Sequence, residues 1–161
     1  MLILGIDPGL NTTGYGLLRL GGREPELVEA GIIRPGSAER EFALRLQELH
    51  AGIAEILAQH QPVALALEQL YSHYEHPRTS ILMGHARGVI CLAGAQAGIP
   101  VIAYSATQIK KTLTGNGRAP KTQMQLAIQR ELRLPALPEP ADVADALAIA
   151  LCHAYAVKSR V

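Results

Sequence analysis

The 161-residue sequence contains no tryptophan, five tyrosines and one phenylalanine, so aromatic side chains supply little of its core. Hydrophobic residues still make up 48% of the chain, which excludes general disorder and predicts a core of Leu, Ile, Val and Ala. Cysteine is also scarce. Cys91 and Cys152 stand alone in apolar runs, a pattern that favours buried reduced thiols over a disulfide or a zinc site.

Long hydrophobic runs are absent as well. No stretch approaches the ~20 apolar residues of a membrane span, and Asp7 interrupts the first apolar run too early for a secretory signal. We therefore expect a cytoplasmic protein without a membrane partner. The length falls within the usual range of about 100–200 residues for one domain, so we expect a single domain over residues 1–161.

Acidic residues are missing from residues 76–130, although the whole chain has 14 acidic and 15 basic residues and a net charge of only +1. That segment carries seven basic residues, whereas residues 1–75 carry five basic and ten acidic ones. The near-neutral total therefore hides a segregation of charge. A long basic stretch without carboxylates predicts an anionic ligand.

The apolar pattern predicts an alternation of strands and helices. Strands are expected at 2–7, 14–20, 27–33, 63–68 and 100–104. Helices are expected at 39–60, 79–97, 105–114, 120–132 and 141–157, and Ser105-Ala106-Thr107-Gln108 has the form of a capping box that opens the third of them. The first three strands have tight connections and predict an antiparallel meander, and the near-continuous apolar run at 63–68 is typical of a strand buried on both faces. The order predicts an α/β fold with a central mixed five-stranded sheet flanked by helices.

Four carboxylates stand where such a sheet could bring them to one edge. Asp7 ends the first predicted strand and Glu68 ends the fourth, while Asp142 and Asp145 lie one turn apart near the start of the last helix. Hard oxygen ligands of this kind suit Mg²⁺ or Mn²⁺. The alternative is structural, since an Asp before Pro-Gly can cap a turn and acids favour helix N-termini.

Short motifs follow one another along nearly the whole chain. They are Gly5-Ile6-Asp7-Pro8-Gly9, Thr13-Gly14-Tyr15-Gly16, Leu67-Glu68-Gln69, Ala86-Arg87-Gly88, Gly115-Asn116-Gly117-Arg118-Ala119-Pro120-Lys121 and Asp142-Val143-Ala144-Asp145-Ala146-Leu147-Ala148. Together they resemble the RuvC Holliday-junction resolvases. The resemblance implies a ribonuclease H-like fold, a homodimer and Mg²⁺-dependent nicking of two symmetric strands of a four-way DNA junction in recombination and repair.

By the same resemblance, Asp7, Glu68, Asp142 and Asp145 are the metal-binding catalytic acids, with two Mg²⁺ per active site or Mn²⁺ in their place. Independently of the family, two divalent ions roughly 3.5–4 Å apart can activate a water and stabilise a leaving 3′-oxygen, which is what phosphodiester hydrolysis needs.

Within the acid-free segment, Lys110, Lys111, Arg118 and Lys121 surround a Gly-Asn-Gly turn. A glycine turn lets backbone approach a phosphate, and basic side chains that neutralise phosphates release counterions. We therefore expect all four to contact DNA, the alternative being an exposed charged face. The resemblance adds catalytic roles for Lys110 and Lys121 near the scissile phosphate, as charge stabilisers or proton donors.

The polar loop after Glu68 carries Tyr71, whose ring could stack on a base opened at the junction or pack back on the domain. The family often has Phe at this place. Arg78 matches a position where the family contacts DNA. His73 and His76 in the same loop are interpreted as exposed polar residues, not as metal ligands.

The oligomeric state has a physical argument of its own, because symmetric cleavage needs two active sites related by a two-fold axis. The helix expected at 79–97 is rich in Gly and Ala and is the candidate dimer interface. Resemblance alone suggests the RuvA–RuvB branch-migration complex as a further partner.

Other functions remain open at this point. Another metal-dependent ribonuclease H-fold nuclease or integrase, acting on RNA–DNA hybrids, would keep the acids without the aromatic residue or the dimer. A non-catalytic junction-binding module would have no reason to keep all four acids. The Gly-Ile-Asp motif also resembles the phosphate loop of sugar-kinase and actin-like ATPases, but those need two lobes and 161 residues are too few.

Overall fold

The computed structural model describes residues 1–70 and 77–159. Tyr71, His73 and His76 lie outside the described residues. The strands are β1 (Leu2–Asp7), β2 (Thr13–Arg19), β3 (Glu26–Ile33), β4 (Ala64–Glu68) and β5 (Val101–Tyr104). The helices are α1 (Phe42–His60), α2 (Pro77–Gln96), α3 (Ala106–Thr114), α4 (Lys121–Glu131) and α5 (Ala141–Lys158). Each element lies within a few residues of its predicted range.

The strands form one mixed sheet in the order β3-β2-β1-β4-β5. β1, β2 and β3 pair antiparallel through short connections, whereas β1 with β4 and β4 with β5 pair parallel. Parallel neighbours need a crossover, and here α2 connects β4 to β5. The predicted mixed five-stranded sheet is confirmed.

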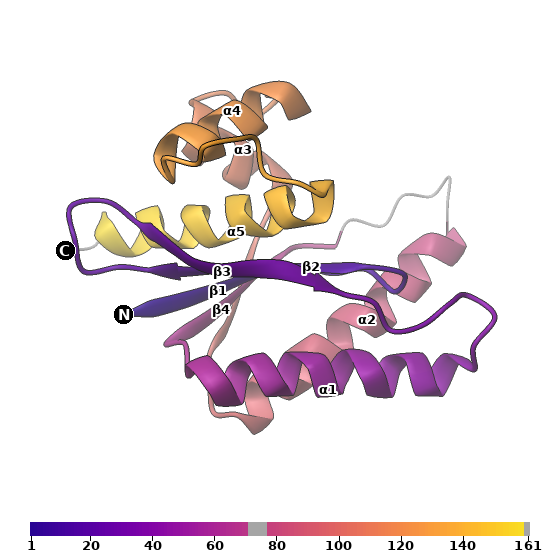
Figure 1. Cartoon of the computed structure of the whole chain (residues 1–161). Helices are drawn as coiled ribbons and strands as arrows, with labels where there is room; N and C mark the ends of the chain where they lie inside the picture. The colour runs from indigo at the N-terminus through magenta and orange to yellow at the C-terminus, as the bar shows by residue number, and fades with distance from the viewer. Residues whose placement is uncertain (71–76, 160–161) are drawn as a thin grey trace.

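Helices cover both faces of the sheet (Figure 1). α1 and α2 lie against one face, and α5 lies against the other with α3 and α4 beyond it. Each face has its own hydrophobic cluster, because successive residues of a strand point to opposite sides. Ile3 and Leu18 belong to the α5 side, and Leu4 and Leu17 belong to the α1 side.

Small residues allow α5 to lie unusually close to the sheet. A Cβ added at Gly5 in β1 would come within 2.3 Å of the Ala146 carbonyl oxygen, and one at Gly16 in β2 would meet Leu147. A side chain at either position would therefore push the helix away. The glycines of the two N-terminal motifs bring the start of α5 down onto the ends of β1 and β2.

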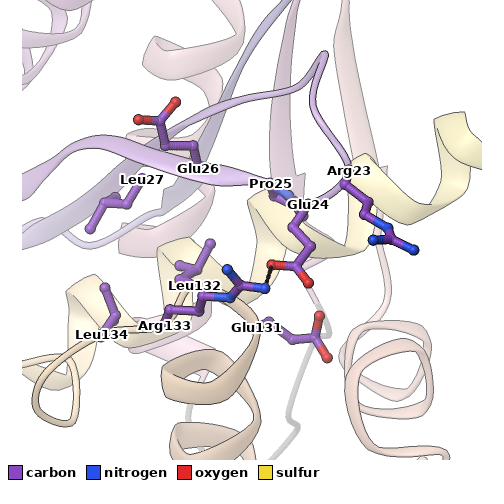
Figure 2. A pocket seen from close by; sticks show the side chains of 9 residues that line it. All are labelled: Arg23, Glu24, Pro25, Glu26, Leu27, Glu131, Leu132, Arg133 and Leu134. Carbon is purple, nitrogen blue, oxygen red and sulfur yellow. Dashed lines mark ion pairs between the residues drawn. The ribbon is translucent and has the colours of Figure 1, made fainter.

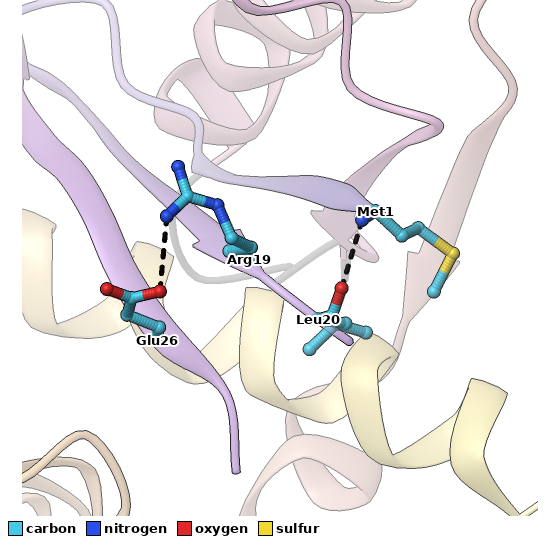
Figure 3. Close-up of polar contacts among 4 residues, drawn as sticks. All are labelled: Met1, Arg19, Leu20 and Glu26. Atoms are coloured by element: carbon cyan, nitrogen blue, oxygen red, sulfur yellow. Dashed lines mark hydrogen bonds and ion pairs between the residues drawn. The ribbon is translucent and has the colours of Figure 1, made fainter. Parts of the chain in front are cut away.

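The sheet has two chemically different ends. At one end, the Met1 ammonium group donates to the Leu20 carbonyl oxygen at 2.9 Å, and an exposed Arg19–Glu26 ion pair bridges β2 and β3 (Figure 3). A hollow of about 780 Å³ beside this end is lined by the β2–β3 turn and the residues after α4, with an ion pair between Glu24 and Arg133 (Figure 2). The other end carries the acids.

Two further expectations can be compared with the structure. Both cysteines are free, Cys152 buried and Cys91 partly buried, as predicted. Among the described residues, no helix combines the length and the apolar character that crossing a lipid bilayer requires.

Candidate active site

The four predicted acids lie in the same region, near the carboxyl ends of β1 and β4. These strands are parallel neighbours with Ile6 opposite Leu67, so Asp7 and Glu68 leave the sheet side by side. Asp142 lies in the first turn of α5, and Asp145 follows one turn later. A Cβ on Gly14, which pairs with Asp7 across β1 and β2, would stand 2.0 Å from the Asp142 carbonyl oxygen. This close approach places the helix start beside the strand ends.

The pKa of Asp7 reflects the other three acids. Burial raises the pKa of its carboxyl group to about 7, and repulsion from Asp145, Glu68 and Asp142 adds to that effect, while Lys121 opposes it. The pKa values of Glu68 and Asp145 are also raised, in both cases mainly by burial. Desolvation and neighbouring negative charge both disfavour the ionised form. The cluster therefore has a strong need for positive charge.

Two lysines supply part of that charge. Lys121, the first residue of α4, holds its Nζ 3.6 Å from Oδ2 of Asp145. Lys110 on α3 partly opposes the rise in the pKa of Glu68. A hollow of about 520 Å³ is lined by Glu68, Asp145 and both lysines, together with Arg118. The structure thus brings two of the acids and three of the four predicted basic residues into one hollow, while Lys111 lies exposed on α3.

The basic residues are held by a well-defined helix end and turn. The predicted capping box at the start of α3 is present, with Ser105 and Gln108 bonded reciprocally. α3 ends at Gly115, whose φ of 75° favours glycine. Beyond it, the side chain of Asn116 accepts a hydrogen bond from the Arg118 backbone N–H at 3.0 Å. Local hydrogen bonds therefore fix the path of the chain between Lys110 and Lys121.

A second hollow, of about 790 Å³, borders the acids at Asp142. It is lined by Asp142, by residues 9–12 between β1 and β2, and by Arg40, Arg45 and Arg78. Arg78 was predicted from the sequence to contact DNA, whereas Arg40 and Arg45 were not. The position of Arg45 could have been noticed in the sequence, because it stands four residues before Leu49 on the apolar face of α1, where a charged residue is unexpected.

Comparison with known proteins decides what this arrangement belongs to. A family model described as crossover junction endodeoxyribonuclease RuvC matches residues 3–153. The chain belongs to the RuvC family. The RuvC of Rhodopirellula baltica is 58% identical over 153 residues, which cover 95% of this chain and 85% of that protein.

Solved RuvC structures agree closely with the fold. The structure of Thermus thermophilus RuvC matches with a TM-score of 0.92 and 32% identity, covering 99% of this chain and 97% of that one. The same protein in complex with a Holliday junction substrate matches with a TM-score of 0.93 and 32% identity, covering 99% and 96%. The predicted ribonuclease H-like fold is confirmed, and so is the predicted activity, that of a crossover junction endodeoxyribonuclease.

RuvC enzymes are divalent-metal nucleases, and the acids of this chain fit that chemistry. Several half-buried carboxylates that raise one another's pKa form a set of hard oxygen donors whose repulsion a divalent cation would offset. Within residues 1–70 and 77–159, however, no three His, Cys, Asp or Glu side chains converge closely enough to hold an ion by themselves. One member of the set, Asp145, is paired with Lys121 instead.

His153 lies apart from the acids on α5. It is buried, and its Nδ1 stands 2.7 Å from the hydroxyl oxygen of Tyr104 at the end of β5. This contact gives His153 a structural role between α5 and β5.

The raised pKa of Asp7 predicts a pH dependence of stability in EDTA. The unfolded carboxyl loses its proton near pH 3.8 and the folded one near pH 7, so the folded state binds more protons between these values and is destabilised as the pH rises through them. Urea unfolding of the unmodified chain and of Asp7→Asn between pH 4.5 and 7.5 measures this effect. We expect the stability of the unmodified chain, relative to the variant, to fall with rising pH. A constant difference would contradict the assignment.

Proposed function

We propose that this chain, as one nuclease domain in a homodimer, resolves four-way DNA junctions by nicking two strands of like polarity symmetrically. Asp7, Glu68, Asp142 and Asp145 hold the divalent cations, two Mg²⁺ per site or Mn²⁺ in their place. The observation that supports this most strongly is the pKa of Asp7, raised to about 7 by burial and by the other three acids. Holding several carboxylates so close together at the end of a buried sheet is costly unless cations offset their charge.

The acids and the two lysines have separate roles in the proposed reaction. When bound, divalent ions activate a water and stabilise the leaving 3′-oxygen. Asp7 and Glu68 are fixed by hydrogen-bonded strands, so their carboxylates need little reorganisation. Lys110 and Lys121 reach the same hollow, from where an ammonium group can stabilise charge on the scissile phosphate or donate a proton to the leaving oxygen.

DNA contact is proposed for the two sides of the acid cluster. Lys110, Arg118 and Lys121 line one hollow and Arg78 lines the other, with Lys111 nearby on the exposed side of α3. The strand that carries the scissile phosphate would then run across the acids from one basic hollow to the other. Tyr71 is proposed to stack on a base at the junction centre, a role that lies outside the described residues.

This surface predicts a steep salt dependence of junction binding. For each phosphate contact, log K should fall by about 0.9 per unit of log[salt], and Arg118→Gln should reduce the slope by about 1. Fluorescence anisotropy with a labelled, non-cleaved junction in Ca²⁺ or EDTA measures the slope. Arg19→Gln removes an exposed charge at the far end of the sheet and is the matched control. A flat plot, or equal effects of the two variants, would contradict the proposed surface.

The dimer is proposed to form through the outer face of α2. Ile81 and Leu92 are 61% and 52% exposed there, and together with Leu46, Gly84 and Gly88 they line a shallow hollow of about 470 Å³. Exposed apolar side chains beside glycines allow a second helix to approach closely. Two copies related by a two-fold axis would present two acid clusters to the two strands to be cut.

Leu92→Asp is expected to make the chain monomeric, because a carboxylate at the centre of an apolar contact would lose its hydration without a partner. Light scattering at micromolar concentration measures the mass, and paired nicking of a junction should be lost with the dimer. Leu126→Asp is the control, since Leu126 is 59% exposed on α4 instead. A monomeric unmodified chain, or a dimeric Leu92→Asp, would overturn this interface.

The proposal also includes a partner and a cellular location. The family points to the RuvA–RuvB complex as the partner that delivers junctions, and to the cytoplasm as the place of action.

The function itself is tested by incubating the chain with a synthetic four-way junction, a linear duplex and an RNA–DNA hybrid, each with Mg²⁺ or EDTA. We expect paired symmetric nicks in the junction with Mg²⁺ only. Comparable cleavage of the duplex or hybrid would support a nuclease of another specificity.

A further inference from the structure

One arginine is buried near the acids without a carboxylate partner. Arg45 on α1 has a relative exposure of 7%. Its Nη2 donates to the Leu10 carbonyl oxygen at 2.9 Å and to Oδ1 of Asn11 at 2.8 Å, while its Nε has no hydrogen-bond partner. Arg45 forms no ion pair with any residue in the described ranges. A buried guanidinium held only by neutral groups is costly, so its position calls for an explanation.

Filling the core does not explain it. Arg45 lies on the apolar face of α1 in line with Leu49 and Ile53, where a leucine or methionine would pack without any loss of hydration. What an apolar side chain could not do is reach two oxygen acceptors at once, which the planar guanidinium can. The distinctive contribution of Arg45 is therefore its pair of hydrogen bonds to the loop at residues 8–12.

The loop at residues 8–12 connects Asp7 to the start of β2, against which Asp142 packs. It begins directly after Asp7 and leads into β2, where Gly14 lies against the Asp142 carbonyl group. Near its base, the Thr13 hydroxyl donates to the Gly9 carbonyl oxygen at 2.6 Å and accepts from the Gly9 N–H at 3.2 Å. The base of the loop is thus closed by its own hydrogen bonds, and its tip is tied to α1 by Arg45.

We propose that Arg45 is a positioning residue for junction cleavage: it fixes the loop at residues 8–12 against α1 and thereby sets Asp7 relative to Asp142. This inference rests on the proposed catalytic role of Asp7. Arg45 is itself too buried to serve as a DNA contact, but it lines the same hollow as Asp142 and Arg78. Its loss would be transmitted through the loop to the acids, whereas Arg78, the proposed DNA contact in that hollow, lies on α2 and not on the loop.

The test separates the chemical step from binding. Arg45→Met keeps an unbranched apolar stem and removes both hydrogen bonds, Arg45→Lys keeps the charge and a donor nitrogen without the planar guanidinium, and Asn11→Ala removes one acceptor. For each variant we would measure the single-turnover cleavage rate at saturating junction, the junction affinity and the thermal unfolding temperature. Arg19→Met is the matched control at an exposed ion pair far from the acids, and Asp7→Asn is included in the same series.

For Arg45→Met we expect a rate about 10–100-fold lower with unchanged affinity, since small misplacements of reacting groups have effects of this size. Arg45→Lys should recover part of the rate, and Asn11→Ala should lose less of the rate than Arg45→Met. In the double variant that combines Arg45→Met with Asn11→Ala, the two losses should not add. A folded Arg45→Met that cleaves at the normal rate overturns the proposal, as does a loss confined to affinity. If Arg45→Met does not fold, Arg45→Lys and Asn11→Ala decide, and normal rates in both overturn it. Normal cleavage by Asp7→Asn would instead reject the proposed function.

Discussion

Replacing Asp7 with asparagine is expected to lower the rate of junction cleavage about 1,000-fold or more, because a metal ligand at the reacting centre contributes several kcal/mol to transition-state stabilisation. The asparagine side chain has nearly the same shape but no charge, so the strand end should keep its structure. Burial raises the pKa of the Asp7 carboxyl group to about 7, which means that its ionised form is unfavourable in the folded chain. Removing this group should therefore leave the folded chain at least as stable above pH 7. Junction affinity should therefore remain close to that of the unmodified chain.

Two measurements check this expectation. Single-turnover cleavage of a labelled four-way junction in Mg²⁺ gives the rate, and anisotropy without Mg²⁺ gives the affinity. Glu26→Gln is the matched control, because Glu26 is an exposed acid in the Arg19 ion pair at the opposite end of the sheet. Cleavage by Asp7→Asn within tenfold of the normal rate would be incompatible with a metal role for this residue.

The second large effect is expected from Gly14→Ala, which leaves every proposed catalytic side chain in place. The added methyl group would stand 2.0 Å from the Asp142 carbonyl oxygen and 2.4 Å from its carbon, and backbone atoms cannot move aside as a side-chain end can. The start of α5 must therefore shift away from β2, carrying Asp142 and Asp145 with it. We expect a loss of about 1–3 kcal/mol in stability and about 100-fold in cleavage rate.

Urea unfolding and single-turnover cleavage, measured below the unfolding transition, separate the two effects. Gly22→Ala is the control, since Gly22 lies in the β2–β3 turn and the nearest atom to its added Cβ is 3.8 Å away. If Gly14→Ala were as stable and as active as Gly22→Ala, the tight packing of α5 on β2 would not be what positions Asp142.

Much of the fold could be predicted because its signals are local. Short apolar runs marked every strand, the spacing of Leu and Ile marked α1, and Ser105 with Gln108 marked the start of α3 through a capping box that the structure contains. The acids were recognisable as a set because Asp7 and Glu68 end apolar strands. That both strands lie side by side follows from the parallel pairing of β1 and β4.

Other features could not be found in this way. Arg45 was not predicted because a single charge within an apolar helical pattern does not say which oxygen acceptors it will meet 34 and 35 residues earlier in the chain. Lys110 and Lys111 are equivalent neighbours in sequence, yet only Lys110 lines the hollow with Glu68 and Asp145. The direction of a helical side chain depends on how the helix is packed.

The elements, the segregation of charge and, through ordered motifs, the family could all be predicted from the amino-acid order, because these depend on neighbours along the chain. How the charges act on each other depends on the folded arrangement. Burial between β1, β4 and α5 raises the pKa of Asp7 to about 7, and close packing at Gly14 sets Asp142 against the sheet. Desolvation and steric contact depend on distances in space, and residues 7 and 142 become neighbours only when the sheet and α5 come together.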